Sequence, residues 1–429
     1  FAAAWEGLFG SLEYEAVMQQ DKAFDITIDW ENGDSDVLSA AEVYNLIFES
    51  NQPWVISANG TIFTYDKEGI IPGLLKRWYA ERKEMQAKLK DCIAAGNKIE
   101  EEYWDKRQLV KKINLNSLYG AILNPGCRFF DKRIGQSTTL TGRSIARHMD
   151  AHVNECIHGK YDHTGESIIY GDTDSCYFSA WSAVKADVEA GRMEWSKETC
   201  IQLYDSIADQ VNESFPAFME QAFHCPRDMG ELIKAGRELI GDRAIFIVKK
   251  RYAINIFDKE GKRKDKNGDL GDIKAMGLDL KRADTPKYVQ EFLMNILQMV
   301  LQQGKGRTEV IEAVKDFKRI LTAQDSWTKG SPKGVNKLTM YGDLEAKSST
   351  GRANMPGHVR AALNYNYLRR VNGDQYSQKI IDGMKVVVCK LKSNPLGFTS
   401  VAYPVDELRL PKWFTELPFD DSAMEQTLV

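Results

Sequence analysis

The stretch Tyr170-Gly171-Asp172-Thr173-Asp174-Ser175 carries two carboxylates two positions apart. Apolar residues flank it as Ile168-Ile169 and Tyr177-Phe178, a pattern that predicts two strands joined by a tight turn. Alternate residues of a strand share one face, so we expect Asp172 and Asp174 to lie beside one point in space. Carboxylate oxygens suit Mg²⁺, which keeps waters or substrate phosphates among its ligands. Asp and Gly are also ordinary turn residues, so the motif alone favours a polar turn as much as a metal site.

Length and composition bound the class of protein. The chain has 429 residues, 43% of them hydrophobic, which suggests about two to four domains. No apolar run approaches the ~20 residues that cross a bilayer, so we expect a soluble protein with no membrane partner. Seven scattered cysteines without a C-x-x-C pair indicate a reduced, intracellular protein without a zinc site. The chain begins at Phe1 rather than Met, so we expect a fragment.

Charged residues are unevenly distributed along the chain. The net charge of −4 argues by itself against a nucleic-acid partner. Residues 61–133, however, carry 15 Lys and Arg against 10 Asp and Glu, and residues 243–287 carry 13 against 7. Such segregation can place basic faces on an acidic body, although solvated helix faces would give the same counts.

Two long helices are predicted between Pro72 and Asn124. Apolar residues recur at helical spacing over 72–95 and 99–122, and Gly96-Asn97 separates the two segments, which predicts a helical hairpin.

One stripe of the second helix combines three kinds of side chain. Lys112, Asn116 and Tyr119 lie at i, i+4 and i+7, which aligns a cation, an amide and an aromatic ring. Gly120 leaves room beside that ring. The alternative is that Tyr119 packs in a core and Lys112 is an ordinary solvated residue.

The remaining elements follow from periodicity and turn signals. We expect helices at 39–49, 135–158, 198–222 and from 285 onward, strands around 56–65, 245–248, 252–257 and 384–391, and a loop over the Ser-, Gly-, Lys- and Thr-rich residues 325–357. Between two of these strands stands Lys249-Lys250-Arg251-Tyr252. This basic cluster fits phosphate contacts or a charged edge that resists aggregation, and the residues favour neither over the other.

Together these motifs resemble family B DNA polymerases, in particular those of T-even-like bacteriophages. Lys112-Ile113-Asn114-Leu115-Asn116-Ser117-Leu118-Tyr119-Gly120 matches the fingers motif K-x-x-x-N-S-x-Y-G, and Tyr170-Gly171-Asp172-Thr173-Asp174-Ser175 matches the second palm motif. Lys249-Lys250-Arg251-Tyr252 matches the duplex-gripping K-K-R-Y element. Gly69-Ile70-Ile71-Pro72 and Asn394-Pro395-Leu396-Gly397 also stand in the family's order.

For catalysis, the resemblance implies a site for two Mg²⁺ ions. Asp174 would be a ligand of both ions and Asp172 a nearby supporting carboxylate. Glu238 falls where these polymerases keep an auxiliary palm acid, and we include it among the expected metal-site residues.

For the incoming nucleotide, the resemblance assigns four residues. Lys112 and Arg82 would hold the triphosphate, and we count Lys112 among the catalytic residues. Asn116 would line the nucleotide pocket, and Tyr119 would pack under the nascent base pair.

For DNA, the resemblance assigns Lys249-Lys250-Arg251-Tyr252 to the duplex and Lys274-Ala275-Met276-Gly277 to the primer backbone. One departure concerns the triphosphate. Where relatives often carry a second lysine four residues after the fingers arginine, this chain has Gln86, which shifts the expected clamping to Lys83 or Lys88.

The fold implied is α+β with a right-hand polymerase architecture: an antiparallel palm sheet, helical-hairpin fingers and a mostly helical thumb. We expect a palm-linked insertion at 1–68, fingers at 69–124, palm at 125–272 and thumb at 273–429. The implied partners are primer–template DNA, dNTPs and, as a further candidate, a sliding clamp. The implied location is the cytoplasm of an infected bacterial host.

The family's first palm motif, D-x-x-S-L-Y-P, is not found here. Ser117-Leu118-Tyr119 belongs to the fingers motif, and Phe1 follows the place where the first palm motif should end. We expect the missing aspartate, and the exonuclease portion, on a missing segment or another chain. Two functions stay open. One is a DNA polymerase portion that is inactive alone, and the other is a non-catalytic subunit or fragment that binds primer–template DNA.

Overall fold

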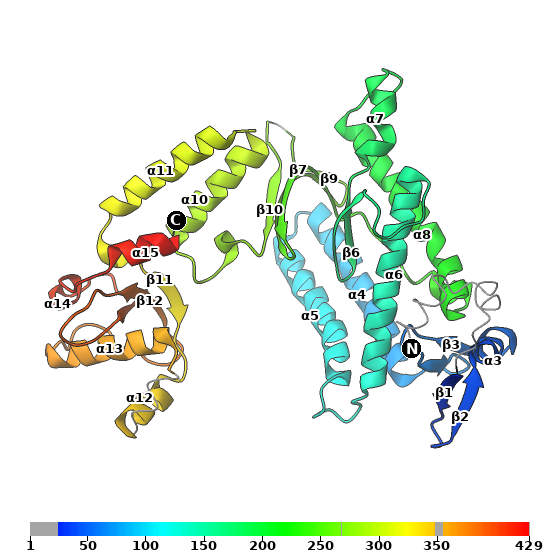
Figure 1. The fold of residues 1–429 in the computed structure, drawn as a ribbon, viewed down its shortest axis with the longest axis horizontal. Coiled ribbons are helices and arrows are strands. Elements are labelled where there is room, and N and C mark those ends of the chain that lie inside the picture. Colours follow the sequence, from blue (N-terminus) through cyan, green and yellow to red (C-terminus); the bar gives the residue numbers. More distant parts are fainter. Residues whose placement is uncertain (1–24, 267, 348–354, 429) are drawn as a thin grey trace. The chain divides into compact units, whose positions relative to one another are not determined.

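The structure, a computed structural model, describes residues 25–266, 268–347 and 355–428. Its contacts divide the chain into two compact units, Phe1–Arg237 and Glu238–Val429. Helices and small antiparallel sheets occur in both units (Figure 1), in agreement with the expected α+β class. Within the described ranges, no helix combines the length and the apolar character that a membrane span requires.

The first described elements form a small module with its own core. β1 (Asp25–Asp29) pairs antiparallel with β2 (Ser35–Ser39), and β3 (Trp54–Ile56) with β4 (Ile62–Thr64). Ser39 and Glu42 form a capping box on α3 (Ala40–Tyr44), which a π-helical turn (Asn45–Glu49) continues. The module buries Ile26, Val43, Tyr44, Ile47 and Ile56. The predicted helix at 39–49 and hairpin at 56–65 are confirmed.

The predicted helical hairpin is also confirmed. α4 (Ile70–Ala94) and α5 (Lys98–Ile122) pack against each other, and Asn97 caps α5 by accepting a hydrogen bond from the Glu100 N–H. Among their side chains only Ile122 is buried. The hairpin therefore depends on helix propensity and on the contacts between its two helices.

The core of the first unit supports a second hairpin, made of strands. β5 (Ile168–Asp172) and β6 (Ser175–Phe178) pack on α6 (Lys132–His158) and α8 (Lys197–Phe223), with α7 (Trp181–Glu189) and α9 (Arg227–Gly230) beside them. The buried side chains are Val153, Ala180, Ile207, Val211 and Phe215. At the start of α6, a Cβ on Gly135 would lie 2.0 Å from the Leu123 side chain, so glycine permits this close approach of α6 to the end of α5.

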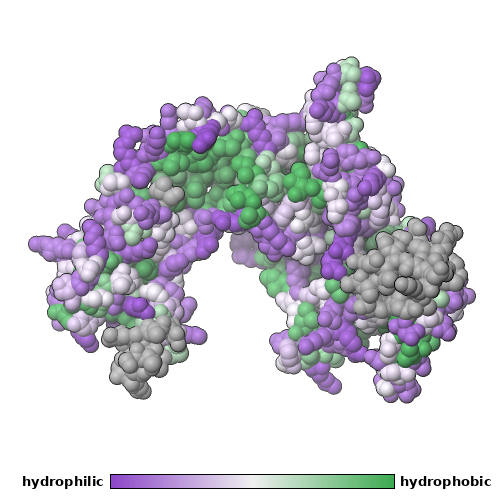
Figure 2. Space-filling view, in the orientation of Figure 1, coloured by the Kyte–Doolittle hydropathy of each residue, from purple (hydrophilic) through white to green (hydrophobic). Residues whose placement is uncertain are grey.

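The second unit begins with an antiparallel sheet in the order β10-β8-β7. Its strands are β7 (Leu239–Val248), β8 (Arg251–Lys259), the short β9 (Lys262–Arg263) and β10 (Asp272–Met276). A 3₁₀ turn (Asp279–Lys281), α10 (Lys287–Leu297) and a π-helical turn (Gln298–Gln302) pack on it. Phe292 of α10 stacks on Phe317 of α11 (Arg307–Ala323), with ring centroids 3.9 Å apart. Figure 2 shows apolar residues gathered over these two helices.

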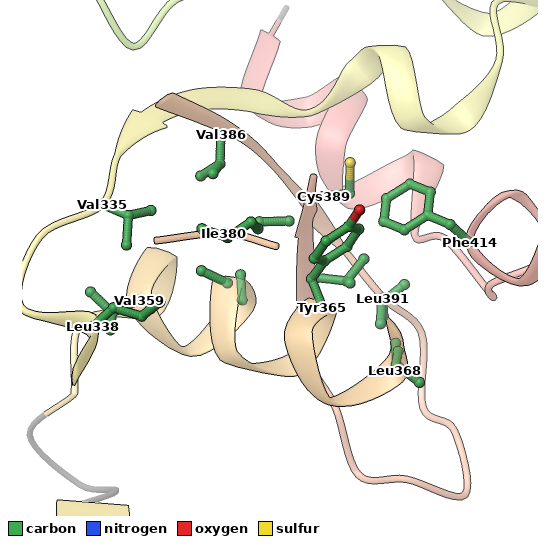
Figure 3. Packing of buried hydrophobic residues seen from close by; sticks show 14 of the residues in the cluster. Val335, Leu338, Val359, Tyr365, Leu368, Ile380, Val386, Cys389, Leu391 and Phe414 are labelled. Carbon is green, nitrogen blue, oxygen red and sulfur yellow. The ribbon is translucent and has the colours of Figure 1, made fainter. Parts of the chain in front are cut away.

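A three-stranded sheet and one covering helix form the largest core. β11 (Ser331–Gly334), β12 (Lys385–Lys390) and β13 (Ser400–Pro404) are antiparallel, and α13 (Gly357–Val371) packs on them. Figure 3 shows Tyr365 and Leu368 of α13 beside Cys389, Leu391 and Phe414. The remaining elements are a 3₁₀ turn (Ser326–Lys329), α12 (Leu338–Lys347), α14 (Lys412–Thr415) and α15 (Asp421–Leu428).

The loop predicted over 325–357 is wrong in part, because this segment contains β11 and α12. The polar composition of this segment gave no strand signal, because β11 forms by pairing with β12, more than fifty positions away in the sequence. Next to β11, Lys329 is 3% exposed and its Nζ lies 2.8 Å from Glu425 of α15. The predicted boundary between residues 272 and 273 falls inside the second unit. The four domain ranges and the right-hand architecture remain predictions.

A buried histidine lies inside the first unit. His148 Nδ1 lies 2.7 Å from the Tyr161 hydroxyl and Nε2 lies 2.8 Å from the Ser214 hydroxyl, while the ring stacks on Phe218. Burial, and secondarily His152, lowers the pKa of His148 to about 4.

We predict that His148 makes the first unit sensitive to acid. Because its pKa is about 4 when folded and about 6.5 when unfolded, the stability from neutral His148 is present above pH 6.5 and is lost as the pH falls from 6.5 through 4. His148→Gln should therefore show a smaller drop in melting temperature between pH 7.5 and pH 5 than the parent, measured by circular dichroism. Exposed His163 is the control, and His163→Gln should keep the full drop. An equal drop in His148→Gln would contradict the prediction.

Candidate active site

The acidic turn connects β5 and β6 through two residues. Asp172 pairs with Ser175 as the last rung of the ladder, so Thr173 and Asp174 form the turn itself. Thr173 adopts a left-handed backbone with φ 59°, and the Asp174 N–H donates to the Asp172 carbonyl at 2.7 Å. The expectation that alternation along a strand places both acids on one face is wrong, because Asp174 is not in a strand. The turn conformation sets its direction instead.

The two acids differ in exposure, and both are oxygen donors. Asp174 is exposed and Asp172 is half-buried. Carboxylates at a solvent-facing turn have the chemistry that Mg²⁺ takes together with waters or phosphates. In the described part of the chain, no group of three or more His, Cys, Asp or Glu side chains is arranged to hold a metal ion. The turn therefore carries two oxygen-donor side chains of the kind that Mg²⁺ prefers.

An ion pair sets the register between α4 and α5. Glu81 of α4 forms an ion pair with Lys111 of α5. The hydrogen bond from Lys111 lowers the pKa of Glu81, and this effect is larger than the opposing effect of burial. Because each residue rises about 1.5 Å along its helix and the two helices run antiparallel, this pairing leaves Arg82 and Lys112 offset by about 3 Å along the hairpin, within one helical turn of each other. Neither has an ion pair with an acid among the described residues, and Arg82 Nε is buried without a hydrogen-bond acceptor there.

The three residues of the predicted stripe on α5 differ in their surroundings. Lys112 and Asn116 are exposed, whereas Tyr119 is half-buried and its hydroxyl donates to the Gly135 carbonyl at 3.4 Å. A Cβ on Gly120 would meet nothing within 4 Å, so there is open space beside Tyr119. The ring of Tyr119 is thus fixed from the α6 side, while Lys112 and Asn116 remain accessible.

The two alternative clamping lysines already contact aromatic rings. Lys83 Nζ lies 5.3 Å from the centroid of Tyr79, and Lys88 Nζ lies 4.6 Å from that of Trp104. Such contacts stabilise an exposed cation by about 0.5–1 kcal/mol. A phosphate would have to draw either lysine away from its ring, which it need not do for Lys112.

The basic cluster forms the tip of the β7–β8 hairpin. Lys249 and Lys250 make its two-residue turn, with Lys250 at φ 63°, and Arg251 pairs with Asp279 at 3.0 Å. Tyr252 is only 7% exposed and stacks on Phe246. Its ring therefore supports the hairpin from inside, and the cations are the parts of this cluster that face solvent.

Lys274 and Glu238 are in contact, although the sequence predicted a DNA contact for Lys274 and a place in the metal site for Glu238. Lys274 Nζ donates to Glu238 Oε1 at 3.1 Å within the second unit. Beside them, Gly277 has φ +63° and a Cβ there would lie 2.0 Å from the Lys250 carbonyl oxygen. Glycine thus permits the close contact between the Lys274–Gly277 segment and the basic turn.

One acid near the acidic turn is not among the residues predicted from the sequence. Asp150 of α6 is half-buried and accepts a hydrogen bond from the Cys176 thiol. Burial raises the pKa of Asp150. A signal was available, because Asp150 stands at i, i+3 and i+7 with Val153 and Ile157 on the apolar stripe of α6.

Comparison with known proteins identifies the family. A model of DNA polymerase family B matches residues 12–225. The chain therefore belongs to DNA polymerase family B. Within that family it is 30% identical over 324 residues to the DNA-directed DNA polymerase of Enterobacteria phage T4, covering 71% of this chain and 33% of the relative. It is 28% identical over 309 residues to the enzyme of Escherichia phage RB69, with 69% and 33% covered.

An archaeal relative is also similar. The DNA polymerase of Pyrococcus glycovorans is 28% identical over 258 residues, covering 60% of this chain and 27% of the relative. The chain thus spans about a third of the length of the curated relatives it matches. The resemblance to family B polymerases, and to the T4-like phage enzymes, is confirmed.

We predict that Gly277 is required for the contact with the basic turn. Gly277→Ala should combine the strain of a left-handed alanine, about 1–2 kcal/mol, with an overlap that costs about 1–3 kcal/mol more. Gly261 is the matched control, because it also has positive φ but nothing within 4 Å of its Cβ position. Urea unfolding should show a larger loss of stability for Gly277→Ala than for Gly261→Ala. Equal losses would contradict the predicted overlap.

Proposed function

We propose that this chain carries part of the active site of a DNA-directed DNA polymerase, which adds nucleotides from dNTPs to a primer 3′-OH under the direction of a template. The observation that carries the proposal is the pair of carboxylates at the β5–β6 turn of a family B chain, exposed Asp174 and half-buried Asp172. In the reaction, the primer 3′-oxygen attacks the α-phosphorus, the bond to the pyrophosphate oxygen breaks, and the 3′-hydroxyl loses its proton.

Asp174 would hold two Mg²⁺ ions and Asp172 would support them. When bound, such a pair stabilises the attacking and leaving oxygens of an in-line displacement. The remaining carboxylate is the first-palm-motif aspartate, which we assign to a segment outside this chain. Glu238 is a weaker candidate as an auxiliary ligand, because it already accepts a hydrogen bond from Lys274.

Arg82 and Lys112 would bind the triphosphate. They lie within about one helical turn of each other along the α4–α5 hairpin, and neither forms an ion pair with an acid among the described residues. Asn116 lies one helical turn beyond Lys112 and would line the nucleotide pocket. Tyr119, held at the Gly135 carbonyl, would pack under the nascent base pair. Binding in this geometry orients the α-phosphorus for attack, which is the main contribution that side chains make to phosphoryl transfer.

The sugar–phosphate backbone of primer–template DNA would contact the second unit. Lys249, Lys250 and Arg251 present positive charge at the β7–β8 turn, Tyr252 supports that turn, and Lys274 would reach the primer strand. Phosphate contacts of this kind position a duplex without reading its sequence. We further propose the right-hand architecture, with the partner segment completing the palm, a sliding clamp as a further partner, and action in the infected bacterial cytoplasm.

A second candidate function is a subunit or fragment that binds primer–template DNA without catalysis. The observation that favours it is that the described residues contain no cluster of three metal-binding side chains. An accessible Lys112 and Asn116 favour the polymerase instead, because a pure DNA-binding module has no use for residues that hold a triphosphate.

Primer extension separates these two functions. With Mg²⁺ and dNTPs, we expect the chain alone to bind primer–template DNA and to extend it poorly or not at all. Adding a chain that bears the first palm motif should give extension, and Asp174→Ala should then remove it by about a thousandfold or more, as loss of a metal ligand does. Asp162→Ala, at an acid remote from the turn, is the control and should retain activity.

Two outcomes would contradict the polymerase proposal. Robust extension by the 429-residue chain alone would show that no further aspartate is needed. Restored extension that survives Asp174→Ala would remove Asp174 from the chemistry.

DNA binding gives an independent prediction at the basic turn. Lys249→Gln together with Lys250→Gln should weaken duplex binding and lower the slope of log K against log salt by roughly 2, because each phosphate contact contributes about 0.9. Fluorescence anisotropy between 50 and 200 mM salt, values within the range where such slopes are measured, checks this. Lys379→Gln with Lys412→Gln, two exposed lysines elsewhere in the second unit, should leave the slope unchanged. The same slope in both double variants would contradict a role for the basic turn.

A further inference from the structure

Asp150 lies on the side of the β5–β6 hairpin opposite to Asp172. Gly171 and Cys176 face each other across the two strands, directly before the rung formed by Asp172 and Ser175. Successive residues of a strand point to opposite faces. A side chain that contacts Gly171 and Cys176 therefore lies on the face of the hairpin opposite to the side chains of Asp172 and Ser175. α6 runs along that side and contacts both strands.

The contacts of Asp150 are specific to this rung. The Cys176 thiol donates a hydrogen bond to the Asp150 carboxyl group. Asp150 Oδ2 would be 3.8 Å from a Cβ built on Gly171, so the carboxyl lies against the bare backbone there. Asp150 Oδ1 is buried and has no hydrogen-bond partner among the described residues.

A carboxyl group that buries one oxygen without a hydrogen-bond partner destabilises the fold at that point. Leaving such an oxygen unsatisfied costs about 1–3 kcal/mol, and an apolar side chain of similar size would avoid that cost. The turn in front of Asp150 is itself strained, because Thr173 is β-branched and has φ 59°. Strain of this kind persists only where the surroundings hold the backbone in place.

We propose that Asp150 is a positioning residue that holds the Tyr170–Ser175 turn, through Cys176 and the Gly171 backbone, in the conformation that presents Asp172 and Asp174 to metal. The part of this inference that concerns metal binding rests on the proposed function. The part that concerns support of the turn does not. Outer partners of metal ligands typically contribute tenfold to a hundredfold to metal affinity. In this proposal Asp150 acts on the ligands through the backbone of the hairpin.

The test measures metal binding and local mobility in the 429-residue chain. Mn²⁺ titration followed by electron paramagnetic resonance should show about tenfold weaker binding in Asp150→Ala. Asp150→Asn should restore it to within about twofold, because the amide oxygen still accepts the Cys176 hydrogen bond. Amide hydrogen exchange over residues 171–176 should rise in Asp150→Ala and return in Asp150→Asn.

Asn154→Ala is the matched control for general destabilisation. Asn154 is buried one turn further along α6 and bonds the Asp162 carbonyl and the Ser167 N–H, but not the turn. It should lower the melting temperature while leaving Mn²⁺ affinity and exchange over residues 171–176 unchanged. If Asn154→Ala and Asp150→Ala change Mn²⁺ affinity equally, the inference is overturned.

The outcomes also separate this inference from the proposed function. Unchanged Mn²⁺ affinity in Asp150→Ala, with binding abolished in Asp174→Ala, would overturn the positioning role and leave the metal site standing. Mn²⁺ binding that is insensitive to Asp174→Ala would instead overturn the metal site. In that case the exchange measurement decides alone, and unchanged exchange over residues 171–176 in Asp150→Ala would overturn the support of the turn.

Discussion

The two-residue turn between β5 and β6 is the constraint on which the functional account depends. It places Asp174 outside the strand ladder, with Thr173 in a left-handed conformation and a short hydrogen bond from Asp174 to the Asp172 carbonyl. A two-stranded hairpin is marginal by itself, so its shape comes from packing on α6 and α8. The core of the first unit therefore supports the hairpin that carries Asp172 and Asp174.

Charge pairing sorts the cations of the α4–α5 hairpin into structural and available ones. Lys111 is used by Glu81, and Lys83 and Lys88 lie on aromatic rings, whereas Arg82 and Lys112 have no acidic partner among the described residues. In the second unit, Lys249 likewise stands at an exposed turn. A chain of net charge −4 can thus present local positive charge to phosphates.

The sequence predicted the elements with strong local signals. Helical periodicity located α4 and α5, and the helix expected at 39–49 corresponds to α3 and the π-helical turn after it. Sequence patterns did not predict features that depend on other parts of the fold. β11 depends on pairing with the distant strand β12. The direction of Asp174 depends on a turn rather than on strand alternation. The burial of Tyr252 and the Lys274–Glu238 contact are likewise set by tertiary packing. The role of Asp150 depends on tertiary packing as well, because its contacts with Gly171 and Cys176 form only when the β5–β6 hairpin packs on α6.

The most direct test of the central claim is to locate a metal ion at the acidic turn. Crystals of this chain with primer–template DNA, a dNTP, Mn²⁺ and a chain bearing the first palm motif would give an anomalous difference map. The account predicts a peak about 2–2.5 Å from a carboxylate oxygen of Asp174, shared with triphosphate oxygens. A peak elsewhere, with Asp174 touching neither metal nor nucleotide, would contradict it.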